Sequence, residues 1–127
     1  MSALGKYGGG VAIVDDEQSL VEIYRRLLAM KGIPVCFVAY DGDEAIRQFA
    51  GHNPKPRIVL LDYRMPMMDG IKTMKKILSI DPGTRVIFIS ADERVREEAL
   101  KAGAAMFVQK PASVKEILNA VESVAEK

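Results

Sequence analysis

The chain has 127 residues, a formal net charge of +1 and a single cysteine, which together limit its class. A chain of this length typically forms one domain that buries about two-thirds of its unfolded surface. The small net charge disfavours direct contact with nucleic acid, and no apolar stretch is long enough for a membrane span. One cysteine cannot form an internal disulfide and no signal-peptide pattern is present, so we expect a cytoplasmic location.

Strand and helix patterns alternate along the chain. Runs rich in Val and Ile indicate buried parallel strands, and apolar residues at helical spacing indicate helices between them. In chain order we expect a flexible, glycine-rich segment over residues 1–9, strand Gly10–Val14, helix Glu17–Met30, strand Ile33–Val38, a helix that starts near Asp41 and strand Arg57–Leu61. Helix Ile71–Ser79, strand Arg85–Ile89, helix Glu93–Ala102, strand Ala105–Val108 and a helix capped by Ser113 complete a domain over residues 10–127.

Five strands that alternate with five helices predict a doubly wound α/β fold with three layers. Ligands of such sheets bind beyond the carboxyl ends of the strands. Polar residues follow four of the expected strands at that end: Asp15, Asp16, Asp62, Ser90 and Lys110, the last followed by Pro111. We therefore expect three carboxylates, a hydroxyl and an ammonium group to lie close together.

This combination suits a divalent cation beside a phosphoryl group. Carboxylate oxygens are typical ligands of Mg²⁺, which keeps several waters, and Mn²⁺ is a plausible substitute. The sequence contains no cluster of His and Cys that would indicate zinc or iron. The carboxylate of Asp62 could act as a nucleophile and form an aspartyl-phosphate, while Lys110 and Ser90 stabilise the phosphoryl oxygens.

A structural role for each residue is the competing interpretation. Asp15 and Asp16 precede a helix, where acidic residues commonly cap the first turn, and Ser90 could be a cap as well. Capping does not readily explain why all four strand ends carry such residues. In addition, the bond between Lys110 and Pro111 can be cis, which would direct the lysine toward the other side chains.

The same residues resemble those of the receiver domains of two-component response regulators, of the type found in chemotaxis. The resemblance extends from about Gly10 to Ala125. Its most specific part is an aspartate followed by a Met-Pro-x-Met-Asp-Gly loop, here Asp62 and residues 65–70. The other matching segments are Ile13–Glu17, Ile89–Ala91, Ala102–Ala104 and Lys110-Pro111.

The resemblance implies a flavodoxin-like fold with strand order 2-1-3-4-5. It also implies a role for each site residue: Asp62 as the phosphoacceptor, Lys110 as the phosphate-binding lysine, and Ser90 and Phe107 as switch residues. The implied ligands of Mg²⁺ are Asp15, Asp16, Asp62 and the main-chain carbonyl of Arg64. Phe107 stands where tyrosine is frequent, and an ordinary core phenylalanine is an equally good interpretation of it.

The implied partners are proteins. A sensor histidine kinase or a phosphotransfer protein would donate the phosphoryl group. The fourth helix, fifth strand and fifth helix would form a switchable surface for an unspecified output partner or for a homodimer. Arg64 and Asp92 flank the expected entrance, and we expect Arg64 to cover the phosphoryl group and Asp92 to hold Arg64 or order the attacking water.

Two other functions compete with this one. An aspartate-nucleophile phosphohydrolase would act as an enzyme on external substrates, but such enzymes carry Asp-x-Asp after the first strand, whereas Asp15 and Asp16 are adjacent. A flavodoxin-like cofactor binder would need a phosphate loop rich in Ser, Thr and Gly after the first strand, and this chain has none there. We therefore favour a signalling receiver that catalyses only its own phosphotransfer and dephosphorylation.

Overall fold

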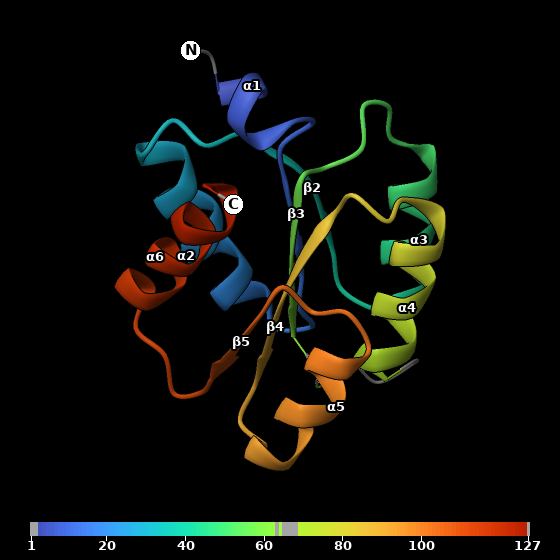
Figure 1. The fold of residues 1–127 in the computed structure, drawn as a ribbon. Coiled ribbons are helices and arrows are strands. Elements are labelled where there is room, and N and C mark those ends of the chain that lie inside the picture. Colours follow the sequence, from blue (N-terminus) through green and yellow to red (C-terminus); the bar gives the residue numbers. More distant parts are fainter. Residues whose placement is uncertain (1–2, 63, 65–68, 127) are drawn as a thin grey trace.

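A single parallel sheet forms the centre of the computed structural model, which describes residues 3–62, 64 and 69–126. The sheet has five strands in the order β2-β1-β3-β4-β5 (Figure 1). The strands are β1 (Val11–Val14), β2 (Val35–Ala39), β3 (Ile58–Asp62), β4 (Arg85–Ser90) and β5 (Met106–Gln109). The predicted fold class and strand order are therefore confirmed.

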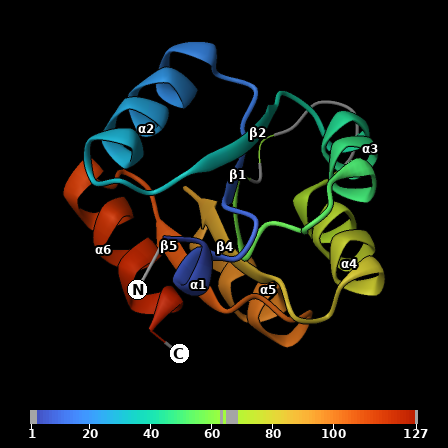
Figure 2. The ribbon, with the colours of Figure 1, turned by 90° about the horizontal axis from the view of Figure 1, so that it is seen from above.

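Helices cover both faces of the sheet, as right-handed crossovers between parallel strands require. They are α2 (Gln18–Met30), α3 (Gly42–Gly51), α4 (Gly70–Ile80), α5 (Arg96–Lys101) and α6 (Val114–Ala125). Helices α2 and α6 lie on one face, and α3, α4 and α5 lie on the other (Figure 2). The fourth predicted helix begins as a short 3₁₀ turn, η1 (Glu93–Val95), which continues directly into α5.

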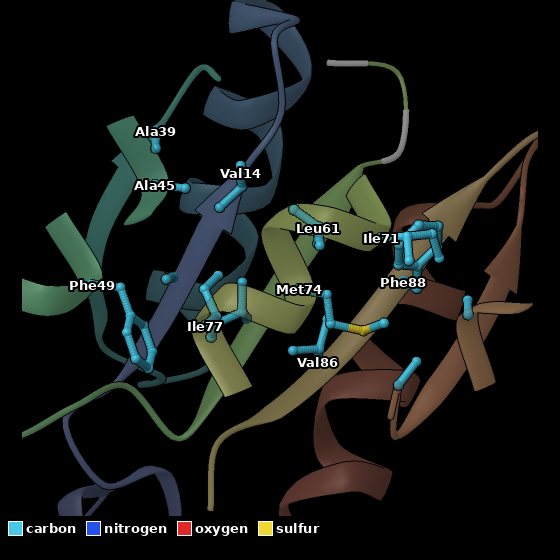
Figure 3. Packing of buried hydrophobic residues seen from close by; sticks show 14 of the residues in the cluster. Val14, Ala39, Ala45, Phe49, Leu61, Ile71, Met74, Ile77, Val86 and Phe88 are labelled. Atoms are coloured by element: carbon cyan, nitrogen blue, oxygen red, sulfur yellow. The ribbon is translucent and has the colours of Figure 1, made fainter. Parts of the chain in front are cut away.

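Alternation along the strands divides the buried side chains between two cores. In β3, Val59 and Leu61 pack under α3, α4 and α5, whereas Ile58 and Leu60 pack under α2 and α6. Because successive strand residues point to opposite faces, a strand buried on both faces has a continuous apolar sequence. Figure 3 shows the first core, where Phe49 of α3 and Met74 of α4 lie against the strands.

Side-chain caps begin α3 and α6 at the positions that the sequence predicts. The Asp41 carboxylate accepts a hydrogen bond of 2.8 Å from the Glu44 N–H group at the start of α3. At α6, Ser113 and Glu116 form a capping box, in which each side chain accepts from the backbone of the other residue. Such caps satisfy backbone donors that have no partner within the helix.

The first residues of the chain are the main departure from expectation. A short helix, α1 (Ala3–Tyr7), lies within the segment expected to be flexible. Tyr7 is only 6% exposed and belongs to the core under α2 and α6. Lys6 forms an ion pair with Glu126 after α6, and Gly9 donates a backbone hydrogen bond to Lys55. The Tyr7 ring therefore packs part of this segment against the core, which the glycines around it did not suggest.

Candidate functional site

Three polar side chains are deeply buried at the carboxyl ends of the central strands. Asp15 follows β1, Asp62 ends β3 and Ser90 ends β4, and each is at most 3% exposed. Carboxylates are rarely buried to this extent unless a cation or hydrogen-bond donors compensate their charge. The burial of Asp15 and Asp62 together therefore marks this edge of the sheet as a site and not as a set of solvated caps.

Asp62 accepts contacts from two sides. Its Oδ2 atom is ion-paired with the Lys110 ammonium group, whose side chain is also largely buried. Its Oδ1 atom accepts a hydrogen bond of 2.8 Å from the Arg64 N–H group. The main-chain N–H group of Lys110 donates a hydrogen bond of 2.9 Å to the main-chain carbonyl of Ser90. The peptide bond between Lys110 and Pro111 is cis. Backbone pairing thus fixes the lysine opposite the aspartate.

Burial raises the pKa of Asp15 to about 7, and the nearby negative charge of Asp62 contributes to this shift. A hydrogen bond of 3.0 Å from the Glu17 N–H group opposes it, as does the positive charge of Lys110. When both carboxylates are ionised, one ammonium group leaves an excess of negative charge. The local electrostatics therefore favour an additional cation.

The donor set fits a hard cation such as Mg²⁺, since it consists of carboxylate oxygens. Asp15 and Asp62 lie close enough to interact, whereas Asp16 is exposed. In the part of the chain that the structure describes, no three acidic, His or Cys side chains are gathered into a ready-made metal site. Mg²⁺ commonly takes one or two protein carboxylates and several waters, so two buried carboxylates are sufficient for it.

The ion pair that we expected between Arg64 and Asp92, at the entrance to the site, is not formed in the structure. Asp92 does not pair with Arg64, because its two carboxylate oxygens accept hydrogen bonds from Arg94 over 3.0 and 3.1 Å. The Asp92 N–H group donates to the Ser90 hydroxyl over 3.0 Å. An arginine two residues away in sequence reaches Asp92 easily, and the turn into η1 holds both. Arg64 instead lines the crevice beside Lys110.

This crevice, which adjoins the buried aspartates on the side of Lys110, has a volume of about 330 Å³, and Asp15, Asp62 and Ser90 are not among its lining residues. Its lining includes Tyr24 of α2, which the sequence does not single out because its spacing marks it only as part of an apolar stripe. Burial raises the pKa of Tyr24 to about 12, and the charges of Asp15 and Asp62 contribute. Residues 63 and 65–68, which hold most of the Met-Pro-x-Met-Asp-Gly motif, lie outside the described residues.

The predicted switch residues occupy adjoining strands. Phe107 in β5 pairs in register with Phe88 in β4, two residues before Ser90. The Phe107 ring points inward and is only 7% exposed. The second interpretation of this residue, as a core phenylalanine, therefore describes its present position, and a switch role would require the ring to have a second, outward position as well.

The doubly wound sheet, with two buried aspartates and a lysine at its carboxyl edge, gives the features by which this chain can be compared with known proteins. The model of the family described as "Response regulator receiver domain" matches residues 11–122. The chain is 34% identical over 121 residues to the chemotaxis protein CheY of Thermotoga maritima, and the match covers 94% of this chain and 99% of that protein. It is 33% identical over 116 residues to CheY of Treponema pallidum, with coverage of 90% and 81%.

Solved structures give the same result. The CheX-CheY-BeF3-Mg²⁺ complex from Borrelia burgdorferi contains a chain that matches with a TM-score of 0.84 and 37% identity, over 90% of this chain and 87% of that one. The signal receiver domain of the putative response regulator NarL from Mycobacterium tuberculosis matches with a TM-score of 0.81 and 36% identity, over 91% and 94%.

The chain belongs to the response regulator receiver domain family. It is a receiver domain of a two-component system, a class of signalling protein that is phosphorylated on an aspartate and binds Mg²⁺. Its role is therefore that of a signalling protein and not of an enzyme that turns over an external substrate. None of the described helices is long and apolar enough to cross a membrane.

Proposed function

We propose that Asp62 accepts the phosphoryl group and that Lys110, Ser90 and a bound cation stabilise it. The observation that carries this proposal is the burial of the Asp62 carboxylate against the Lys110 ammonium group, next to the buried Asp15. In the reaction, an Asp62 oxygen forms a bond to phosphorus while the bond from phosphorus to the donor breaks. Lys110 then neutralises one phosphoryl oxygen, which is the main contribution expected of a protein group in phosphoryl transfer.

The cation site in this proposal consists of Asp15, Asp16, Asp62 and the main-chain carbonyl of Arg64. Mg²⁺ would neutralise charge between these carboxylates and the phosphoryl oxygens, and Mn²⁺ would serve as a substitute. Asp16 is exposed at the rim, where it could bind through its carboxylate while waters fill the remaining positions. The related complex from B. burgdorferi contains Mg²⁺ together with BeF3, which supports this assignment.

The partners follow from the chemistry. A sensor histidine kinase or a phosphotransfer protein would supply the phosphoryl group. Once it is attached, the Ser90 hydroxyl would leave the Asp92 N–H group and donate to a phosphoryl oxygen. Because this bond exists only in the modified state, it can shift the population toward a new arrangement of α5, β5 and α6, including Phe107. That surface would bind an output partner or a second receiver.

The direct test is phosphorylation by acetyl phosphate in the presence of Mg²⁺. We expect one phosphoryl group per chain, labile to hydroxylamine, and none in Asp62→Asn. The matched control is Asp43→Asn, which removes an exposed acid in α3 and should leave labelling intact. Equal labelling of Asp62→Asn and the wild-type protein would rule out Asp62 as the acceptor.

The cation assignment has its own test. Asp16→Ala should abolish Mg²⁺-dependent phosphorylation, because the rim carboxylate would no longer hold the ion. Full labelling of this variant at low millimolar Mg²⁺ would remove Asp16 from the site. Replacement of Mg²⁺ by Mn²⁺ should restore labelling after chelation with EDTA, and loss of all labelling with Mn²⁺ would restrict the site to Mg²⁺.

A further inference from the structure

The Phe107 ring is held by two groups of different kinds. It stacks on the fully buried ring of Phe88, with ring centroids 6.2 Å apart and planes inclined by 16°. The Arg96 guanidinium also lies over the Phe107 ring, with Cζ 4.7 Å from the ring centroid. A cation at this distance is attracted by the electrons of the aromatic face. Arg96 therefore makes a specific contact with the one aromatic residue proposed as a switch.

Arg96 is itself fixed in place by a neighbour. Its Nε atom donates to the Glu93 carboxylate over 2.7 Å, and the two residues lie three positions apart at the start of the helical segment. This pair is partly exposed, so its own contribution to stability is small. Its effect is to orient the planar guanidinium group, which then presents a face to the ring.

Few other side chains attach this helical segment to the sheet. In η1 and α5 the buried side chains are Val95 and Ala99, and Leu100 is 43% exposed. A segment with so few buried apolar contacts can move at low cost in free energy. The contact between Arg96 and Phe107 is consequently a substantial part of what ties the start of α5 to β5.

The ring has space to adopt a second position. Phe107 borders a groove of about 470 Å³ that runs along β5 and α6 and is lined by residues such as Met106, Val108 and Ala120. Rotation about the side-chain bonds of Phe107 would carry the ring from the Phe88 contact toward this groove. The groove gives the ring room for an outward position, and Arg96 contacts the ring in the inward one.

We propose that Arg96 is a positioning residue that holds the Phe107 ring inward before phosphorylation and so favours the arrangement that the phosphorylated state uses. The first half concerns the unmodified protein alone, and the second half rests on the proposed function. A modification that stabilises one of two conformations acts more strongly when that conformation is already populated. Loss of Arg96 should therefore release the ring and also weaken the response to phosphorylation.

Fluorine NMR tests the first half in the unmodified protein. The chain has four phenylalanines, so labelling with 4-fluorophenylalanine gives four signals, and Phe107→Leu assigns one of them. We expect the Phe107 signal of Arg96→Ala to broaden or to shift toward its position in the unfolded protein. Arg96→Lys, which keeps the charge but not the planar group, should give a smaller change.

The matched control is Arg94→Ala. Arg94 lies two residues away and is likewise paired with an acid, but its partner is Asp92 and not the residue that orients Arg96. This variant should leave the Phe107 signal where it is in the wild-type protein. An unchanged Phe107 signal in Arg96→Ala, or an equal change in both variants, would overturn the proposal. Unfolding by urea followed on the same samples shows that each variant is folded.

Titration with beryllofluoride and Mg²⁺ tests the second half. A cation–π contact at a partly exposed site corresponds to a change of about two- to fivefold in an equilibrium constant. We expect Arg96→Ala to bind beryllofluoride more weakly by about this factor. The control for this titration is Lys101→Ala, which loses only an exposed ion pair with Glu97 in the same helix and should bind as the wild-type protein does. Unchanged affinity in Arg96→Ala would refute the coupling. If the wild-type protein itself bound no beryllofluoride, the proposed function would fail, while the fluorine signals would still decide the first half.

Discussion

Removal of the Lys110 charge should destabilise the cation-free protein because Asp62 would be left buried without its counter-ion. Lys110→Met keeps the apolar stem and removes the ammonium group that contacts Asp62. Breaking a buried ion pair by removal of one partner costs about 3–5 kcal/mol. The Arg64 N–H group still donates to Asp62, and Lys110 lines a crevice that is open to solvent, so we expect a value at the lower end, about 3 kcal/mol.

Urea denaturation in EDTA measures this effect. With a denaturant dependence of about 1.5 kcal/mol per molar urea, the midpoint should fall by about 2 M. Asp62→Asn introduced into Lys110→Met should recover most of the loss, because the uncompensated charge is then absent. Saturating Mg²⁺ should also recover part of it, since binding to the folded state stabilises that state.

The control is Lys115→Met, which removes an exposed lysine in α6 and should change stability by no more than about 0.5 kcal/mol. A midpoint for Lys110→Met within error of the wild-type protein would contradict the reasoning. So would a double variant with Asp62→Asn that is no more stable than Lys110→Met alone, since the cost would then not arise from the charge of Asp62.

Three further predictions concern the fold. Tyr7→Ala should lower the free energy of unfolding by about 3 kcal/mol in urea denaturation because it empties a buried ring site, and a loss below about 1 kcal/mol would show that α1 is not part of the core. Burial raises the pKa of Cys36 to about 11, so its alkylation rate in the folded protein should keep rising with pH beyond about 9, and a plateau there would contradict this burial. Ser113→Ala should cost about 1 kcal/mol through loss of the α6 cap, measured against Ser123→Ala on the same helix, and equal values for the two would exclude a capping effect.

The strands, and the polar residues at their carboxyl ends, could be predicted from the sequence to within a few residues. The strand β3 has only apolar residues before Asp62 because both of its faces are covered, whereas a strand with one face in water would alternate apolar and polar residues. The proximity of the polar residues at the carboxyl ends of the strands could also be predicted, because parallel strands bring these ends to one edge of the sheet. Asp15, Asp62, Ser90 and Lys110 do meet there.

Contacts that depend on individual rotamers and on unusual local packing could not be predicted. The sequence offers two arginines near Asp92, and only the structure shows that Arg94 pairs with it. Arg96 resembles the solvated charges around it because a cation–π contact leaves no periodic pattern. Tyr7 lies in a glycine-rich segment that resembles a flexible end, and nothing local to the sequence indicates that its ring fits a core built by distant residues.

The ion pair between Lys6 and Glu126 has a practical consequence for work with this molecule. It joins α1 to the end of α6 at the edge of the sheet where the strands begin (Figures 1 and 2), opposite the carboxyl ends of the strands. The strands separate these two edges by about 15 Å. A fluorophore, affinity tag or surface linker joined at either end would therefore leave the carboxyl edge of the sheet accessible. A linker after α6 is the safer choice, because one placed before α1 would pull on the segment that buries Tyr7.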